Sequence, residues 1–287
     1  MKYADRKGNY WEETSFQDIF LEKLYDSVVG RMLIRVLILP PVSRFGGWVL
    51  DTPVSKLLIP GFIRRHHLNP EQWEKQKFTS YNDFFTRKLR EGERPLPESD
   101  EYFISPCDGK LTVYPISEKG RFTIKHTGYT LAQLLRNEKL ARRFQNGFIL
   151  IFRLTVDDYH RYHYVADGVK SSNYRIPGVF HTVNPIANDW EPIYRENTRE
   201  YCLLHTKEFG TVLMMEVGAL MVGKIHNYHG AGKVKKGQEK GRFEFGGSTI
   251  VVLTEPGKVQ IDRDLLKNSR HGYETVVKSG ETIGRKS

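Results

Sequence analysis

The chain has 287 residues, and its 44 lysines and arginines outnumber its 34 aspartates and glutamates, giving a net charge of +10. This length corresponds to one or two domains, and 39% apolar residues allow a sizeable core. The 25 glycines and 13 prolines follow no period, and 27% charged residues is ordinary, so the composition excludes collagen, coiled coil and a disordered chain. The surplus of positive charge favours an anionic partner, either phospholipid or nucleic acid.

Neither the cysteines nor the apolar segments indicate export or a membrane span. Cys107 and Cys202 allow at most one disulfide, which a chain of this length does not need, so we expect reduced thiols. Acidic residues occupy the place where a secretory leader would be apolar, so we expect no signal peptide. The best candidate span, residues 32–39, contains Arg35 and precedes two prolines, far short of the ~20 apolar residues needed. A membrane contact would therefore be peripheral.

The first ninety residues have the pattern of a small helical region. A capping-box sequence at 14–17 precedes apolar residues at helical spacing. Residues 28–62 are apolar, interrupted by four prolines and dotted with arginine and lysine, which together with Trp48 resembles an interfacial anchor on acidic lipid. A helical subdomain packed on its own core is the alternative. Residues 71–91 are also predicted to be helical, and a polar connector with prolines follows at 90–100.

Beyond residue 100 the pattern changes to strands separated by glycine-rich turns. Apolar and β-branched runs predict strands at 111–116, 148–154, 211–217, 219–225, 249–253 and 258–262. One helix interrupts them, with Leu131, Leu134 and Leu135 on one face. We therefore expect an α+β fold, with a small helical, membrane-facing region at 1–90 and a larger, mainly-β domain at 91–287.

Two histidines form the first candidate site. His160 and His163 lie three residues apart and follow two aspartates, which suits acid–base catalysis or zinc binding. His226 and His229 repeat the spacing. Residues three apart in a strand face opposite sides, which argues against a shared metal, and ordinary structural histidines are the alternative.

A serine and an aspartate are the other candidates. Ser248 follows two glycines and begins a β-branched run, so the backbone before it can bend at little steric cost. A nucleophile elbow would need glycine where Ile250 stands, and a plain hairpin turn is the alternative. Asp108 lies in a turn sequence. An aspartate, a histidine and a serine on separate segments are the ingredients of an activated nucleophile, but sequence alone cannot place them together.

Seven segments in order resemble the phosphatidylserine decarboxylase family in its proenzyme form. They are SPCDG (105–109), DYHRYH (158–163), GVFHTVNP (178–185), NTR (197–199), VGALMVGKI (217–225), KGQEKG (236–241) and FGGSTIV (245–251). The GGST form is most similar to the second bacterial branch of the family. The resemblance runs from about residue 84 to the C-terminus. Cys107 stands where alanine is more usual, and the first ninety residues match only in character.

This resemblance implies that the chain makes its own cofactor. Ser248 attacks the carbonyl carbon of Gly247, with His163 as its base and Asp108 as the carboxylate that orients the imidazole. The resulting ester eliminates to dehydroalanine, which hydrolyses to a pyruvoyl group at the start of a C-terminal fragment of 40 residues. The pyruvoyl group forms a Schiff base with the substrate amine. His160 is implied as the proton donor in decarboxylation or as a contact to the substrate carboxylate.

The resemblance also implies the substrate and the setting. Phosphatidylserine is decarboxylated to phosphatidylethanolamine by a peripheral enzyme on the cytoplasmic face of the cell membrane. We expect the anionic membrane surface and the cleaved C-terminal fragment as partners, and neither metal nor nucleic acid; a homodimer is left open. Three alternatives remain: a pyruvoyl decarboxylase of a soluble amino acid or related phosphoserine lipid, a non-catalytic β-domain that binds acidic lipid or nucleic acid, and a zinc hydrolase built on the two histidine pairs.

Overall fold

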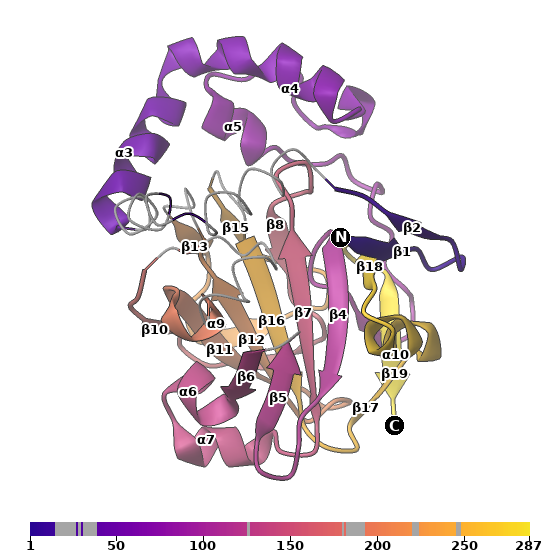
Figure 1. Ribbon diagram of the computed structural model, residues 1–287. Coiled ribbons are helices and arrows are strands. Elements are labelled where there is room, and N and C mark those ends of the chain that lie inside the picture. Colours follow the sequence, from indigo (N-terminus) through magenta and orange to yellow (C-terminus); the bar gives the residue numbers. More distant parts are fainter. Residues whose placement is uncertain are drawn as a thin grey trace.

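A large sheet forms the body of the molecule, and a group of helices covers one end of it (Figure 1). The computed structural model describes residues 1–14, 27, 30, 39–124, 127–179, 181, 193–219, 224–244 and 248–287. The expected α+β class is confirmed. The division near residue 90 stays a prediction.

The helices at the top of Figure 1 come from residues 40–85. They are α3 (Pro40–Asp51), the 3₁₀ helix η1 (Pro53–Leu58), α4 (Ile59–Arg65), the 3₁₀ helix η2 (Pro70–Gln72) and α5 (Tyr81–Phe85). We call α3, η1, α4 and α5 the hood. Their shared core contains Ile59, Trp73, Tyr81, Phe84 and Phe85.

Two segments of the first ninety residues differ from the helical pattern expected there. The helix predicted for 71–91 is limited to η2 and α5, because Trp73 forms an antiparallel bridge with Leu89 and Ser80 caps a new helix by accepting from the Asp83 amide. Residues 2–12 are strands, β1 (Lys2–Ala4) and β2 (Tyr10–Glu12), which pair with each other. The capping box at 14–17 and the pattern after it lie almost wholly outside the described residues.

Within the described residues the large sheet has eleven strands, in the order β14-β9-β11-β12-β16-β7-β4-β18-β1-β2, with β10 also paired to β11. The strands expected at 148–154 and 211–217 are found at those bounds, and those at 111–116 and 249–253 within two residues. Besides β1 and β2 the members are β4 (Gly109–Pro115), β7 (Phe148–Leu154), β9 (Gly168–Lys170), β10 (Tyr174–Ile176), β11 (Arg199–His205), β12 (Thr211–Val217), β14 (Gly232–Val234), β16 (Ser248–Thr254) and β18 (Glu274–Val277).

In the part of the chain that the structure describes, three smaller sheets and four helices pack around the large one. The sheets are β13 (Ile225–Asn227), β15 (Glu239–Phe243) and β8 (Arg161–His163); β17 (Val259–Ile261), β19 (Thr282–Lys286) and β3 (Tyr102–Ile104); and β5 (Arg121–Ile124) with β6 (Thr127–Thr130). The helices are α6 (Leu131–Leu135), α7 (Glu138–Arg143), α9 (Ile193–Glu196) and α10 (Arg263–Arg270). Of the strand expected at 219–225, residues 220–223 lie outside the described chain.

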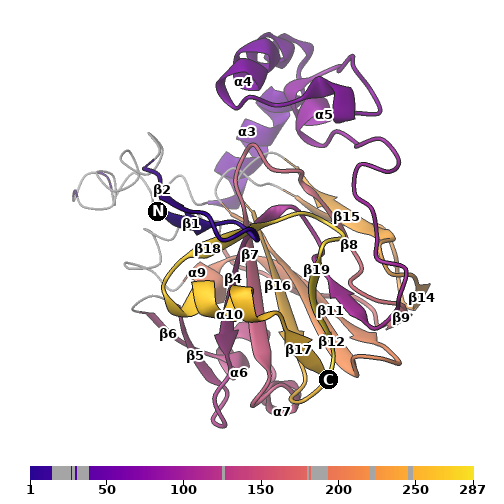
Figure 2. The ribbon, with the colours of Figure 1, turned by 90° about the vertical axis from the view of Figure 1, so that its right-hand side faces the viewer.

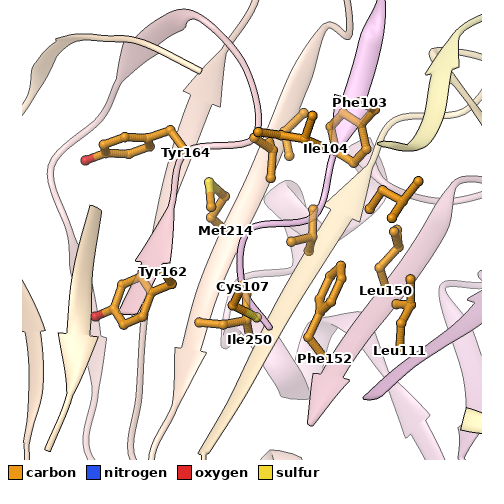
Figure 3. Close-up of a cluster of buried hydrophobic side chains, with 14 of the residues drawn as sticks. Phe103, Ile104, Cys107, Leu111, Leu150, Phe152, Tyr162, Tyr164, Met214 and Ile250 are labelled. Carbon is orange, nitrogen blue, oxygen red and sulfur yellow. The ribbon is translucent and has the colours of Figure 1, made fainter. Parts of the chain in front are cut away.

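Two apolar clusters lie on opposite faces of the central strands. In β16, Ile250 and Val252 join one cluster and Val251 and Leu253 the other, because successive side chains in a strand alternate between faces. The first cluster lies between the large sheet and the sheet β13-β15-β8 (Figure 3). Helices α6 and α7 and the pair β5-β6 cover the second. Burial on both faces explains why the central strands are continuous apolar runs.

Cys107 and Cys202 are buried and form no disulfide. Among the residues that the structure describes, no helix combines the length and the apolar character needed to cross a bilayer.

Candidate active site

Ser248 is the first residue of the central strand β16. It pairs with Leu154 of β7, and the next residue, Thr249, pairs with Val217 of β12. Ser248 is fully buried, and its Oγ makes no hydrogen bond to any part of the chain that the structure describes. Gly247, the other half of the predicted cleavage site, lies outside the described residues. A buried hydroxyl without a partner is costly, so its place at the head of this strand calls for a functional reason.

Asp108 lies in the turn before β4 and is buried among cations. Arg94 donates to both of its carboxylate oxygens, at 2.9 and 2.6 Å, and Lys278 Nζ lies 3.3 Å away. The main-chain amide of Ser279 also donates to it, at 2.8 Å. Glycine is needed at 109, because a Cβ there would lie 2.9 Å from the carbonyl oxygen of Arg153. This close approach seats the Asp108 turn against β7.

His163 lies in β8 and is partly buried. Its Nδ1 is 2.9 Å from Ser279 Oγ and 3.4 Å from the carbonyl oxygen of Pro106. Burial lowers the pKa of His163, so its imidazole is neutral at neutral pH and can accept a proton. Ser279 therefore stands between the two predicted partners, with its amide on Asp108 and its hydroxyl on His163.

A cavity of about 220 Å³ lies beside His163. Its lining includes the cations Lys88, Arg90 and Arg94, together with Tyr159 and Glu239. His163 thus has access to a polar space through which a proton or water can reach the ring.

His160 precedes β8 and is fully buried. Its ring lies 4.1 Å from the ring of Phe85 in α5, and its Nδ1 is 2.9 Å from the carbonyl oxygen of Asp158. A carbonyl oxygen can only accept, so Nδ1 carries the proton and Nε2 is the basic nitrogen. Nε2 has no hydrogen-bond partner among the described residues. Burial lowers the pKa of His160 to about 4, so it is neutral at neutral pH.

The backbone ties the turn 154–160 to described residues before and after the predicted cleavage site. The carbonyl oxygen of His160 accepts from the amide of Phe243 in β15 at 2.9 Å, and Leu154, at the other end of the turn, pairs with Ser248. The turn that ends at His160 is therefore anchored both to β15 and to the first residue of β16.

The end of the hood holds this turn in place. Arg87 Nη2 donates to the carbonyl oxygens of Asp157 and Asp158, at 3.3 and 3.5 Å, and Arg161 donates to the carbonyl oxygen of Thr86 at 2.6 Å. Lys110 Nζ lies 2.6 Å from the Asp158 carboxylate. Residues 84–87, where the family resemblance begins, therefore join the hood to the turn that carries His160.

The histidine pairs do not form a metal centre within the described part of the chain, where no group of three or more histidine, cysteine or acidic side chains could hold an ion. His226 Nε2 bonds Glu244 at 2.7 Å, and His229 contacts Tyr164 and Gln238. Sequence reasoning missed Arg94 and Ser279, which hold Asp108 and His163. The only sequence signals are that Arg94 lies in a polar connector and that Ser279 precedes a turn glycine.

The fold and these groups define an enzyme. A buried serine, two neutral histidines and an aspartate paired with cations lie around one end of the large sheet. The family model described as phosphatidylserine decarboxylase matches residues 81–285. Over 281 residues the chain is 43% identical to phosphatidylserine decarboxylase proenzyme 2 of Clostridium acetobutylicum, covering 98% of this chain and 96% of that protein. It is 40% identical over 295 residues to the phosphatidylserine decarboxylase proenzyme of Chlamydia caviae, covering 99% and 98%.

The chain belongs to the phosphatidylserine decarboxylase family. It is a carboxy-lyase, and its reaction is the decarboxylation of phosphatidylserine to phosphatidylethanolamine. The resemblance seen in the sequence is thereby confirmed. The roles of Asp108, His160, His163 and Ser248 stay predictions.

Proposed function

We propose that the chain is a precursor that cleaves itself between Gly247 and Ser248 and converts Ser248 into the pyruvoyl group used for decarboxylation. The observation that carries this proposal is the Ser248 hydroxyl at the head of β16, which is buried and has no hydrogen-bond partner among the described residues. It fits a residue that is to be chemically converted. The printed names of the relatives, which include the word proenzyme, support it.

The chemistry requires a nucleophile, a base and an orienting group. Ser248 Oγ attacks the Gly247 carbonyl carbon while His163 accepts the hydroxyl proton, and the acyl group moves from the Ser248 nitrogen to its Oγ. Elimination then removes the Cα proton of Ser248 to a base and breaks the Cβ–Oγ bond, which releases Gly247 as a carboxylate and leaves dehydroalanine. One water molecule then hydrolyses the dehydroalanine: its oxygen becomes the ketone oxygen of the pyruvoyl group, and the nitrogen of Ser248 leaves as ammonia. Asp108 acts on His163 through Ser279, and domain 91–287 carries all of these groups.

The mature group supplies an electron sink for the bond that loses carbon dioxide. His160 is proposed to serve this second reaction. With Nδ1 bonded to the Asp158 carbonyl, only Nε2 is available to a substrate, and it carries no proton at neutral pH. His160 must therefore first accept a proton before it can return one to the substrate carbon.

Mass spectrometry of the purified protein tests self-cleavage, and native gel filtration tests the fate of the fragments. We expect fragments 1–247 and 248–287, the smaller lighter than its serine form by one ammonia. They should elute together and separate only in denaturant, because β16 lies between β12 and β7, β18 between β4 and β1, and β19 pairs with β3. Figure 2 shows this segment in colours from orange-gold to yellow, spreading from β16 to α10 and β19. A fragment lost without denaturant, or an uncleaved chain with full activity, would contradict the proposal.

We further propose that the hood docks on anionic lipid at the cytoplasmic face of the membrane. Large apolar side chains of α3 and η1 are exposed there: Phe45 by 65%, Trp48 by 63%, Val54 by 71% and Leu57 by 81%. Exposed cations accompany them, namely Lys56, Arg64 and Arg65. Apolar insertion together with ~1 kcal/mol per cation near an acidic surface favours such docking. A diacyl substrate then reaches the site without leaving the bilayer.

Replacing Val54 and Leu57 by aspartate should lower binding to phosphatidylserine vesicles at least about tenfold. The substitutions remove two apolar contacts with the lipid and add two carboxylates that the anionic surface repels. Flotation of the full-length protein measures this. A matched control replaces Val169 and Tyr174, which are 49% and 57% exposed on the large sheet, by aspartate. Equal flotation of the two double variants would refute docking through the hood.

A further inference from the structure

Ser279 is the residue through which the two predicted relay groups communicate. It is 4% exposed, its amide donates to Asp108 at 2.8 Å, and its Oγ lies 2.9 Å from His163 Nδ1. The Asp108 carboxylate is otherwise held by Arg94 and Lys278. Within the described chain, no hydrogen bond joins Asp108 directly to His163.

The atoms around Nδ1 decide which imidazole nitrogen is basic. The carbonyl oxygen of Pro106, at 3.4 Å, can only accept a hydrogen bond, and the hydroxyl of Ser279 can also accept one. Both are therefore satisfied by a proton on Nδ1. The lone pair is then on Nε2, the tautomer that can take a proton from a nucleophile.

Resting on the self-cleavage proposed above, we propose that Ser279 is a positioning residue: its hydroxyl accepts from Nδ1–H and holds the His163 ring in the orientation that presents Nε2 as the base, while the Pro106 carbonyl oxygen favours the proton on Nδ1. The hydrogen bond from the Ser279 amide to the Asp108 carboxylate holds Ser279 in place, so that Asp108 orients the imidazole indirectly, through Ser279. Ser279 lies 116 residues from His163 and belongs to the same fragment, 248–287, as the nucleophile. The downstream fragment thus supplies both the attacking hydroxyl and the group that prepares its base.

The first test is the rate of self-cleavage in full-length precursor made by pulse-labelled cell-free synthesis. Ser279→Ala should slow cleavage about tenfold, the effect of one hydrogen bond in the transition state. Ser279→Thr keeps the hydroxyl and should restore most of the rate. Ser269→Ala is the matched control, because Ser269, in α10 of the same fragment, also loses one hydrogen bond, from the amide of Val113 at 2.9 Å; its rate should match wild type.

The second test reads the tautomer directly. In the Ser248→Ala background, ¹⁵N-histidine NMR should show His163 protonated at Nδ1, with its resonance assigned by His163→Gln. Adding Ser279→Ala should leave the proton on Nδ1, because the Pro106 carbonyl oxygen remains, but should shift the Nδ1 resonance, because the ring loses its 2.9 Å hydrogen bond. The pH titration of the same resonance also responds to the charged and titratable groups near the ring, and its analysis must account for them. These groups are Lys88, Arg90, Glu91, Arg94, Asp108, Tyr159, Arg161 and Glu239.

The outcomes separate this inference from the function on which it rests. If His163→Ala blocks cleavage but Ser279→Ala cleaves like Ser269→Ala, the positioning role is wrong and the relay stands. If His163→Ala cleaves like wild type, the relay itself is wrong. Slow cleavage in both Ser279 variants with an unchanged Nδ1 resonance would show a packing role and also overturn the inference.

Discussion

Ser248→Ala is expected to leave the chain whole and without decarboxylase activity, because no other atom can replace the attacking Oγ. Its fold should not suffer. The hydroxyl is buried and unpartnered among the described residues, so its removal takes away a polar group whose burial costs about 1–3 kcal/mol. Intact-mass spectrometry should therefore show one species, and thermal unfolding should occur at a temperature no lower than that of an uncleaved precursor such as His163→Ala.

Thr249→Ala provides a stringent control. Thr249 is the next residue, is equally buried, and its hydroxyl also has no partner among the described residues. Strand alternation turns it to the opposite face of β16, the face of Val251 and Leu253. The Thr249→Ala variant should therefore be cleaved like wild type. A chain that still splits after Gly247 in Ser248→Ala, or that stays whole in Thr249→Ala alone, would remove the basis of the proposal.

The two histidines should separate cleavage from turnover. His163→Ala is expected to slow self-cleavage by about 10²- to 10⁴-fold, the usual contribution of a general base. His160→Ala should still be cleaved, but its decarboxylation of phosphatidylserine in vesicles should fall by a similar factor. Mass spectrometry and released carbon dioxide measure the two reactions independently. The reverse pattern, with cleavage lost only in His160→Ala, would exchange the two assignments.

The pH dependence of cleavage follows from the burial of His163. Its folded pKa is lowered below the ordinary value of 6.5, so the ring stays neutral and able to accept a proton through that value. The cleavage rate should therefore remain constant as the pH falls through 6.5 and decline only at lower pH, where the imidazolium forms. A decline that begins above pH 6.5 would indicate a different base.

The central strands were predictable because burial on both faces leaves long apolar runs at 148–154 and 211–217. The bridge between Trp73 and Leu89 was not, since it depends on residues sixteen apart whose local sequence favours a helix. The same holds for β1, which pairs with β18 near the other end of the chain. Local patterns carry no information about such distant pairings.

The candidate site, too, was only partly predictable from the sequence. Ser248, His160, His163 and Asp108 could be named from short motifs, because the chemistry restricts the residue types. Their mutual arrangement could not, since Arg94 and Ser279 reach Asp108 from segments without any catalytic pattern. Motifs suggest candidate reacting groups, whereas the contacts that orient those candidates depend on the folded chain.

If the chain cleaves itself as proposed, the interior position of β16 determines the order of events during biosynthesis. If the peptide bond were broken before the sheet assembled, two separate molecules would have to find each other, and dilution would oppose their union. A continuous chain meets no such obstacle, so folding would come first and bond breakage second. The cleaved enzyme would then have no efficient route back from the unfolded state, and its lifetime would depend on how slowly it unfolds.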